Sequence, residues 1–137
     1  MSTPADLDTA IARSISTIPE CLAAGYVDVG SGLLLAIRTV DSHPREVVDL
    51  VAAATSDLFQ GQNVATVEAI WKRARGIESS RHYFQEIIVN SDNIIHVFIR
   101  GKKYQDYVVV FACRNTANIG MVLAKSRMAV PMIESAV

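Results

Sequence analysis

Two neighbouring segments near the start of the chain read as β-strands that are apolar on both sides. They run from Cys21 to Val29 and from Leu33 to Val40, and Gly30-Ser31-Gly32 joins them in a turn that suits a tight hairpin. A strand with apolar residues on both sides of its alternation is covered on both of its faces. The sequence therefore predicts a sheet that lies between layers of helix.

The rest of the chain supplies the predicted helices and three more strands. We expect helices at Thr3–Ile18, Pro44–Arg75 and Asn118–Ser135, the second with a break near Gly61, and strands at His82–Asn90, Ile94–Arg100 and Tyr107–Arg114. Pro131 predicts a kink or an early end in the last helix. Since hairpin turns join neighbouring strands, the predicted fold class is α+β, with an antiparallel five-stranded sheet, the order α-β-β-α-β-β-β-α and helices on both faces.

Length and composition narrow the class of protein. The chain has 137 residues, of which 50% are hydrophobic and 20% charged, so we expect one folded domain over residues 1–137 and exclude disorder. The longest apolar run, Tyr107 to Cys113, is far shorter than the ~20 residues of a membrane span. A net charge of −1 offers no basic footprint for nucleic acid. The hydrophobic share is larger than a small monomer comfortably buries, and this surplus indicates an oligomer.

The first ten residues lack the features of a secretory signal, and the chain has two cysteines. We therefore expect a cytoplasmic protein, with two buried thiols as the favoured state and one disulfide left open.

The sequence shows no constellation typical of catalysis or metal binding. The glycine pair at Gly30 and Gly32 is followed by a strand rather than a helix, so it does not fit a phosphate-binding loop. The histidines and cysteines have no partner at ligand or nucleophile spacing: His43, His82, His96, Cys21 and Cys113. We expect no cofactor, no metal and no enzymatic activity.

A basic cluster follows the single tryptophan. Lys72, Arg73, Arg75 and Arg81 lie close to Trp71 in the sequence. Basic residues commonly gather at the end of a helix because they complement its dipole, and that interpretation is favoured over a site for phosphate or an acidic partner. Trp71 is either a core anchor or an anchor in an interface.

Two segments resemble the roadblock/dynein light chain family, whose fold is related to longin and profilin-like domains. The first, Ile18 to Ile37, contains GYVDVGSGLLLAI, similar to the opening strand, turn and second strand of the family. The second is YVVVFACRNTANIGMVLAKSRMAV, in which an aliphatic strand and a short polar loop precede Asn118-Ile119-Gly120 at the start of a helix with Lys125 and Arg127. The resemblance, to a prokaryotic member, extends from Asp6 onward. Gly61 to Arg81 departs from it as an added segment.

This resemblance implies a non-enzymatic dimer. In the family, the third strand pairs with its counterpart in a second protomer and the middle helices pack side by side. It assigns the dimer interface here to Tyr83, Phe84, Gln85, Glu86, Ile87, Ile88, Val89, Val47, Leu50, Val51 and Leu58. The strand also carries few charges that would guard an exposed edge.

The resemblance also implies a partner, because prokaryotic members often work with small Ras-like GTPases. We expect a homodimeric scaffold or regulator of such a GTPase, with contacts from Arg45, Asp49, Thr55, Ser56, Gln60 and Trp71. The alternative is a small-ligand sensor with a pocket between sheet and helix, as in profilin-like and PAS-like folds.

Overall fold

The computed structural model describes residues 4–40, 45–76, 82 and 84–137, with the backbone alone for residues 4–5 and 45–50. It confirms the predicted five-stranded antiparallel sheet. The strands are β1 (Cys21–Asp28), β2 (Leu33–Thr39), β3 (Glu86–Asn90), β4 (Ile94–Arg100) and β5 (Tyr107–Arg114). Their order across the sheet is β2-β1-β5-β4-β3, so β2 and β3 are its edges.

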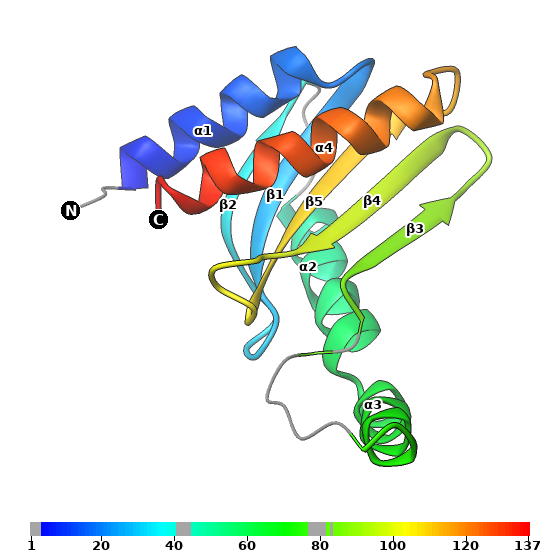
Figure 1. The fold of residues 1–137 in the computed structure, drawn as a ribbon. Coiled ribbons are helices and arrows are strands. Elements are labelled where there is room, and N and C mark those ends of the chain that lie inside the picture. Colours follow the sequence, from blue (N-terminus) through cyan, green and yellow to red (C-terminus); the bar gives the residue numbers. More distant parts are fainter. Residues whose placement is uncertain (1–3, 41–44, 77–81, 83) are drawn as a thin grey trace.

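Helices cover both faces of the sheet, as predicted. On one face, α1 (Pro4–Thr17) packs on β1 and β2, α4 (Ile119–Glu134) packs on β4 and β5, and the two helices contact each other. On the other face, α2 (Arg45–Gln60) contacts β1 and β2. The added helix α3 (Gln62–Ala74) contacts α2 and projects beyond the sheet (Figure 1).

Each face of the sheet has its own apolar cluster. The cluster beneath α1 and α4 is the larger and includes Ile11, Tyr26, Val97, Phe111 and Ile133. The cluster beneath α2 includes Val27, Val29, Phe59, Phe98 and Val110. The central strands are therefore buried on both faces, which explains their nearly continuous apolar sequence.

Local sequence signals set the helix ends. A Cβ at position 61 would lie 2.6 Å from the carbonyl oxygen of Asp57, so the close turn between α2 and α3 requires Gly61. At the start of α4, the Asn118 side chain accepts a hydrogen bond of 3.1 Å from the Met121 backbone N–H. The predicted break near Gly61 is thus confirmed, whereas α4 continues through Pro131 to Glu134.

Two expectations about the strands were wrong. β3 begins at Glu86 rather than at His82, because side-chain hydrogen bonds, described below, hold part of the preceding segment. β2 is not covered on both faces: it is an edge strand on which Leu33, Leu35 and Ile37 are exposed. The predicted caps at Thr3 and at Ser42 or His43 lie outside the described residues.

Candidate functional site

An open apolar groove of about 510 Å³ lies between α2 and the outer strands β3 and β4. Apart from Asp57 and His96, its described lining is apolar: Val51, Ala54, Leu58, Val89 and Phe98. Val51 on α2 and Val89 on β3 leave 40% and 39% of their surface exposed. Exposed apolar residues that line a groove mark a binding surface.

The groove ends at an unpaired strand edge. Among the described strands, β3 pairs with β4 and with no other. Its register with β4 places Ile87 and Val89 on the α2 side and Ile88, opposite Val97, on the α4 side. Ile88 is 42% exposed, so the edge offers apolar side chains as well as free backbone groups.

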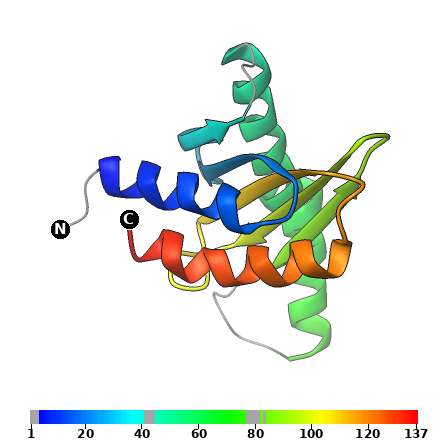
Figure 2. The ribbon, with the colours of Figure 1, turned by 90° about the horizontal axis from the view of Figure 1, so that it is seen from above.

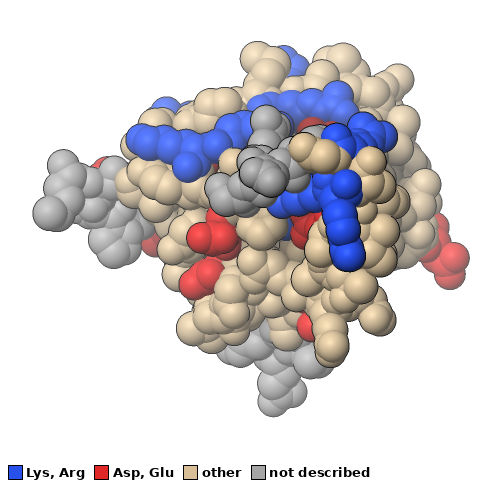
Figure 3. Space-filling view, turned by 60° about the horizontal axis from the view of Figure 1, so that its bottom comes forward, with Lys and Arg blue, Asp and Glu red and all other residues tan. Residues whose placement is uncertain are grey.

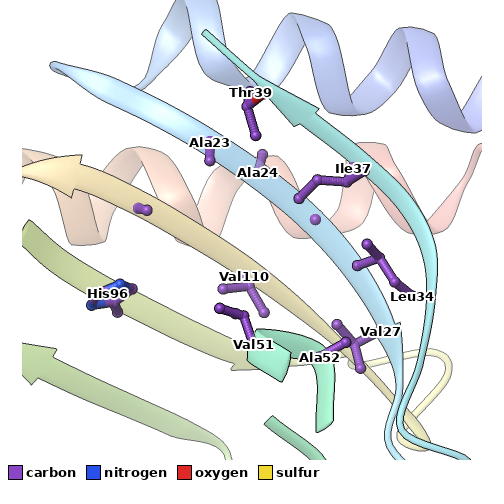
Figure 4. A pocket seen from close by; sticks show the side chains of 12 residues that line it. Ala23, Ala24, Val27, Leu34, Ile37, Thr39, Val51, Ala52, His96 and Val110 are labelled. Atoms are coloured by element: carbon purple, nitrogen blue, oxygen red, sulfur yellow. The ribbon is translucent and has the colours of Figure 1, made fainter. Parts of the chain in front are cut away.

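A smaller cavity of about 150 Å³ lies beneath α2 (Figure 4). Small residues of the central strands leave this space, because Ala23, Gly25 and Ala112 line the sheet side. Val51 and Ala52 of α2 line the opposite side, and Thr39 and His96 bring the polar side chains. The cavity is therefore apolar with two polar groups at its margin.

His96 lies between the cavity and the groove and contributes to both. Its Nδ1 atom is buried and has no hydrogen-bond partner within the described part of the chain. Burial lowers the pKa of His96, because the protonated ring loses its hydration. The imidazole is accordingly neutral at pH 7, and the groove carries no positive charge at this position.

Arg100 connects the groove to the segments around it. The side chain is fully buried at the end of β4. Nε donates to the Phe84 carbonyl at 2.8 Å, Nη1 to the Gln105 carbonyl at 2.8 Å, and Nη2 to the Phe59 carbonyl at 3.3 Å. The guanidinium also lies over the Phe59 ring, 5.1 Å from its centre. One side chain thus holds together the end of α2, the segment before β3 and the β4–β5 turn.

The α3 helix has its own contacts with the segment before β3. The centres of the Trp71 and Phe84 rings are 5.6 Å apart. His82 lies between two carboxylates, with Nδ1 3.7 Å from Oε1 of Glu68 on α3 and Nε2 3.8 Å from Oδ1 of Asp106. Trp71 remains 41% exposed, so it packs on Phe84 without being a core residue. Lysine and arginine side chains are prominent in the view from the α3 end (Figure 3), and α3 carries Lys72 and Arg73 in its last turn.

The structure brings together part of the predicted dimer surface. Val51 and Leu58 of α2 share the groove with Val89, and Ile87 packs on the cluster beneath α2. Phe84 and Gln85 precede the strand instead of lying within it. Tyr83 and the side chains of Val47 and Leu50 lie outside the described residues.

The structure departs further from the predicted partner surface than from the predicted dimer surface. Thr55 is fully buried and donates to the Val51 carbonyl at 2.8 Å, and Ser56 is half-buried and donates to the Val29 carbonyl at the end of β1. Neither side chain is free for a partner. Gln60 is half-buried, and the side chains of Arg45 and Asp49 lie outside those described.

Ala54 and Phe98 belong to the groove and were missed from the sequence. From the sequence, His96 was rejected as a metal ligand and was expected to be either an exposed residue of the strand alternation or a hydrogen-bonded histidine near an interface. The alternation of β4 places His96 and Phe98 on one face, but the sequence alone does not show that α2 leaves that face open. That face stays open because α2 packs over β1 and β2 instead. This position depends on tertiary packing, which the sequence pattern does not reveal.

The described residues do not form a metal cluster: nowhere among them do three His, Cys, Asp or Glu side chains gather in a way that could hold an ion. Cys21 and Cys113 are both free and buried, in agreement with the favoured expectation of two thiols. Within the described chain, every helix is too short or too polar to span a membrane.

Comparison with solved structures identifies the fold. The chain is similar to MglB of Myxococcus xanthus, with 15% identity and a TM-score of 0.69 over 100% of this chain and 94% of that one. It is similar to the gliding protein MglB of Thermus thermophilus, with 16% identity and a TM-score of 0.71 over 99% and 92%. A Roadblock/LC7 domain from Streptomyces avermitilis gives 13% identity and a TM-score of 0.68 over 93% and 94%. Neither a protein-family model nor a curated protein matches the sequence.

Proposed function

We propose that this chain, which has a roadblock/LC7-type fold, forms a homodimer through β3 and α2 and acts in the cytoplasm as a non-catalytic scaffold or regulator of a small Ras-like GTPase. The observation that carries the proposal is the unpaired apolar edge of β3 beside the apolar groove along α2. An exposed edge of this kind associates with another strand unless something covers it.

The edge of β3 suits pairing with its own copy. The Arg100 N–H donates to the Gln85 carbonyl at 2.8 Å, so the backbone of Gln85 faces β4 and that of every second residue from Glu86 faces outward. A twofold axis at Ile88 sets this residue opposite the partner's Ile88 and Glu86 opposite the partner's Asn90. No like charges meet in this register, and the two sheets join into one.

The groove supports the same arrangement. Pairing through β3 brings the α2 helix of the second protomer toward the groove, where Val51, Ala54 and Leu58 of each helix find apolar cover. A strand pair alone buries little side-chain surface, whereas the added helix contact supplies the apolar core of a stable interface.

The GTPase partner rests on the family resemblance of the sequence. Two α2 helices side by side would present one continuous surface, to which each contributes the exposed Asp57. Arg45 and Asp49, at the start of α2, stay in the proposal from the sequence alone. Gln60, at the end of α2, and Trp71, on α3, remain part of the proposed partner surface, at the end that lies nearest α3. Because the described residues show no catalytic constellation, we propose that the scaffold orders the GTPase's own switch loops, and that Arg45 is the side chain to test as an inserted arginine.

The partner proposal is tested with a small Ras-like GTPase encoded by the same genome, loaded with GDP or with a non-hydrolysable GTP analogue. We expect a complex on gel filtration with the GTP-analogue form and a change in the rate of GTP hydrolysis. Asp57→Lys should weaken the complex while the variant keeps the molecular mass of the unaltered protein, which is checked because Asp57 also lines the groove, and Asp8→Lys on α1, exposed on the other face, should leave the complex intact. No complex in either nucleotide state, together with an unchanged hydrolysis rate, would reject the GTPase partner.

A small-ligand sensor is the second candidate, favoured by the apolar cavity beneath α2 and by the unpartnered Nδ1 of His96 at its margin. A small apolar molecule with one hydrogen-bonding group fits these features. Thermal unfolding in the presence of a panel of such metabolites tests it. A rise in Tm that His96→Leu abolishes supports the sensor, and an unchanged Tm across the panel argues against it.

A further inference from the structure

The two cysteines of the chain lie opposite each other on neighbouring central strands. Cys21 begins β1, Cys113 is the next-to-last residue of β5, and the two are partners in the antiparallel ladder. Opposite residues of such a ladder direct their side chains to the same face of the sheet. Both cysteines belong to the apolar cluster beneath α1 and α4, which lie side by side over this face (Figure 2). Two thiols that are far apart in the sequence therefore meet inside the fold.

The position in the ladder gives the two cysteines a separation that suits a disulfide. The Arg114 N–H donates to the Glu20 carbonyl at 3.1 Å. Because these residues flank the cysteines, Cys21 and Cys113 form a non-hydrogen-bonded pair, in which the Cα atoms are about 4.5 Å apart and the side chains approach closely. A disulfide joins residues whose Cα atoms are about 4.4 to 6.8 Å apart. The strand pairing thus provides the separation that the bond requires.

The two thiols interact, and their surroundings make them unequal. A hydrogen bond with Cys113 lowers the pKa of Cys21, and burial opposes this effect without cancelling it. The same hydrogen bond and burial both raise the pKa of Cys113. Cys21 keeps 7% of its surface exposed, whereas Cys113 is fully buried. Cys21 is therefore the thiol with more thiolate character and better access for a small oxidant.

The pair has the composition of a redox site rather than of a metal site. Within the described chain, no third His, Cys, Asp or Glu joins the two thiols in a way that could hold an ion. Cysteines that sense oxidants commonly have a lowered pKa and a second cysteine beside them. Cys21 and Cys113 combine these two features.

We propose that Cys21 and Cys113 form a reversible disulfide on exposure to a small peroxide, and that this bond locks β1 to β5. The Cys21 thiolate attacks one oxygen of hydrogen peroxide, the O–O bond breaks, and hydroxide leaves a sulfenic acid on Cys21. The Cys113 sulfur then attacks the Cys21 sulfur, the S–O bond breaks, and the departing hydroxide takes up the Cys113 proton. In sum, two thiols lose two electrons and two protons, and one hydrogen peroxide becomes two water molecules.

The disulfide would enclose most of the sheet in a covalent loop. The chain between the two cysteines contains β2, α2, α3, β3 and β4. A cross-link that closes a long loop restricts the unfolded chain and so favours the folded state. The cysteines lie on the face opposite α2, so the proposal holds independently of the dimer and of the GTPase.

The test treats the reduced full chain with hydrogen peroxide in native buffer, removes the peroxide and labels free thiols with N-ethylmaleimide in urea. By mass spectrometry we expect both cysteines to be labelled in the untreated protein and neither in the treated protein. Dithiothreitol should restore both labels, and the treated protein should migrate as a single chain on a non-reducing denaturing gel. Labels that peroxide leaves in place, labels that dithiothreitol does not restore, or a cross-link between two copies would overturn the proposal.

Two matched variants test which cysteine reacts first. Cys113→Ser keeps a hydroxyl beside Cys21 but removes the second thiol, so dimedone should trap the sulfenic acid on Cys21 after peroxide treatment. Cys21→Ser should give much weaker labelling of the buried Cys113. Circular dichroism checks the fold of both variants. Labelling of Cys113 as strong as that of Cys21 would overturn the assignment of Cys21 as the attacking thiol.

Urea unfolding tests the lock. We expect the peroxide-treated protein to unfold at a higher urea concentration than the reduced protein. Cys21→Ser should show no such rise, and it controls for the four methionines, which peroxide also oxidises. A disulfide that forms without raising the urea midpoint would overturn the lock.

Discussion

At the scale of single residues, His96 combines burial with an unsatisfied ring nitrogen. It lies between the groove and the cavity beneath α2, and its Nδ1 has no partner among the described residues. A buried polar atom without a hydrogen bond costs stability. Such atoms are rare in native structures, and a partner at the groove or a ligand in the cavity would supply the missing hydrogen bond.

The pH dependence of stability tests this view of His96. Burial holds the folded-state pKa of His96 below its ordinary value of about 6.5, so the unfolded chain takes up a proton at higher pH than the folded chain does. The contribution of His96 is therefore fully present above about pH 6.5 and is lost as the pH falls toward the folded-state pKa. We expect urea midpoints to fall between pH 7.5 and pH 5.5, and to fall less in His96→Leu. An equal fall in both proteins would contradict the assignment.

Single residues with local roles were predictable from the sequence, while those with distant partners were not. Gly61 marks the helix break and Asn118 caps α4, and both effects act within four residues of the chain. Thr55 was expected on the polar side of its helix, among the contacts with a partner. Its hydroxyl bonds instead to the preceding turn, and the whole side chain is buried.

At the scale of elements, the boundaries of β3 depend on contacts that cross the molecule. The alternating pattern of residues 82–90 predicts one long strand, yet the ladder with β4 begins at Glu86. The Arg100 side chain donates to the Phe84 carbonyl and the Gln85 side-chain amide donates to the His82 carbonyl, so side chains bind these two backbone carbonyls ahead of the strand. The prediction that both faces of β2 are covered was wrong for a related reason. The pattern of apolar residues along a strand does not show whether that strand forms an edge of the sheet.

Removal of the Arg100 side chain should therefore destabilise several elements at once. Arg100→Leu leaves the carbonyls of Phe59, Phe84 and Gln105 without their donor in a buried position. We expect a loss of about 3 kcal/mol or more in the free energy of unfolding, measured by chemical denaturation. Arg127→Leu, which removes an arginine from an exposed ion pair, should change the free energy of unfolding much less. Equal effects of the two substitutions would contradict the role assigned to Arg100.

At the scale of the whole molecule, the distribution of apolar surface is uneven. Helices cover the central strands, but β3, the groove along α2 and the outer side of α4 remain apolar and exposed. The apolar surplus in the sequence predicted an oligomer without showing its surfaces. The arrangement of the elements leaves the edge of β3 and the groove along α2 open, and this is the surface that we propose for a second copy.

The molecular mass in solution, measured by light scattering after gel filtration, tests the proposed dimer most directly. We expect the protein to have twice the mass of a single chain, and Ile88→Asp to have the mass of one chain or to aggregate, because the twofold axis would set two carboxylates against each other. Leu33→Asp, a matched change on the other edge strand, should remain a dimer. A single-chain mass for the unaltered protein, or an unchanged dimer mass for Ile88→Asp, would contradict pairing through β3.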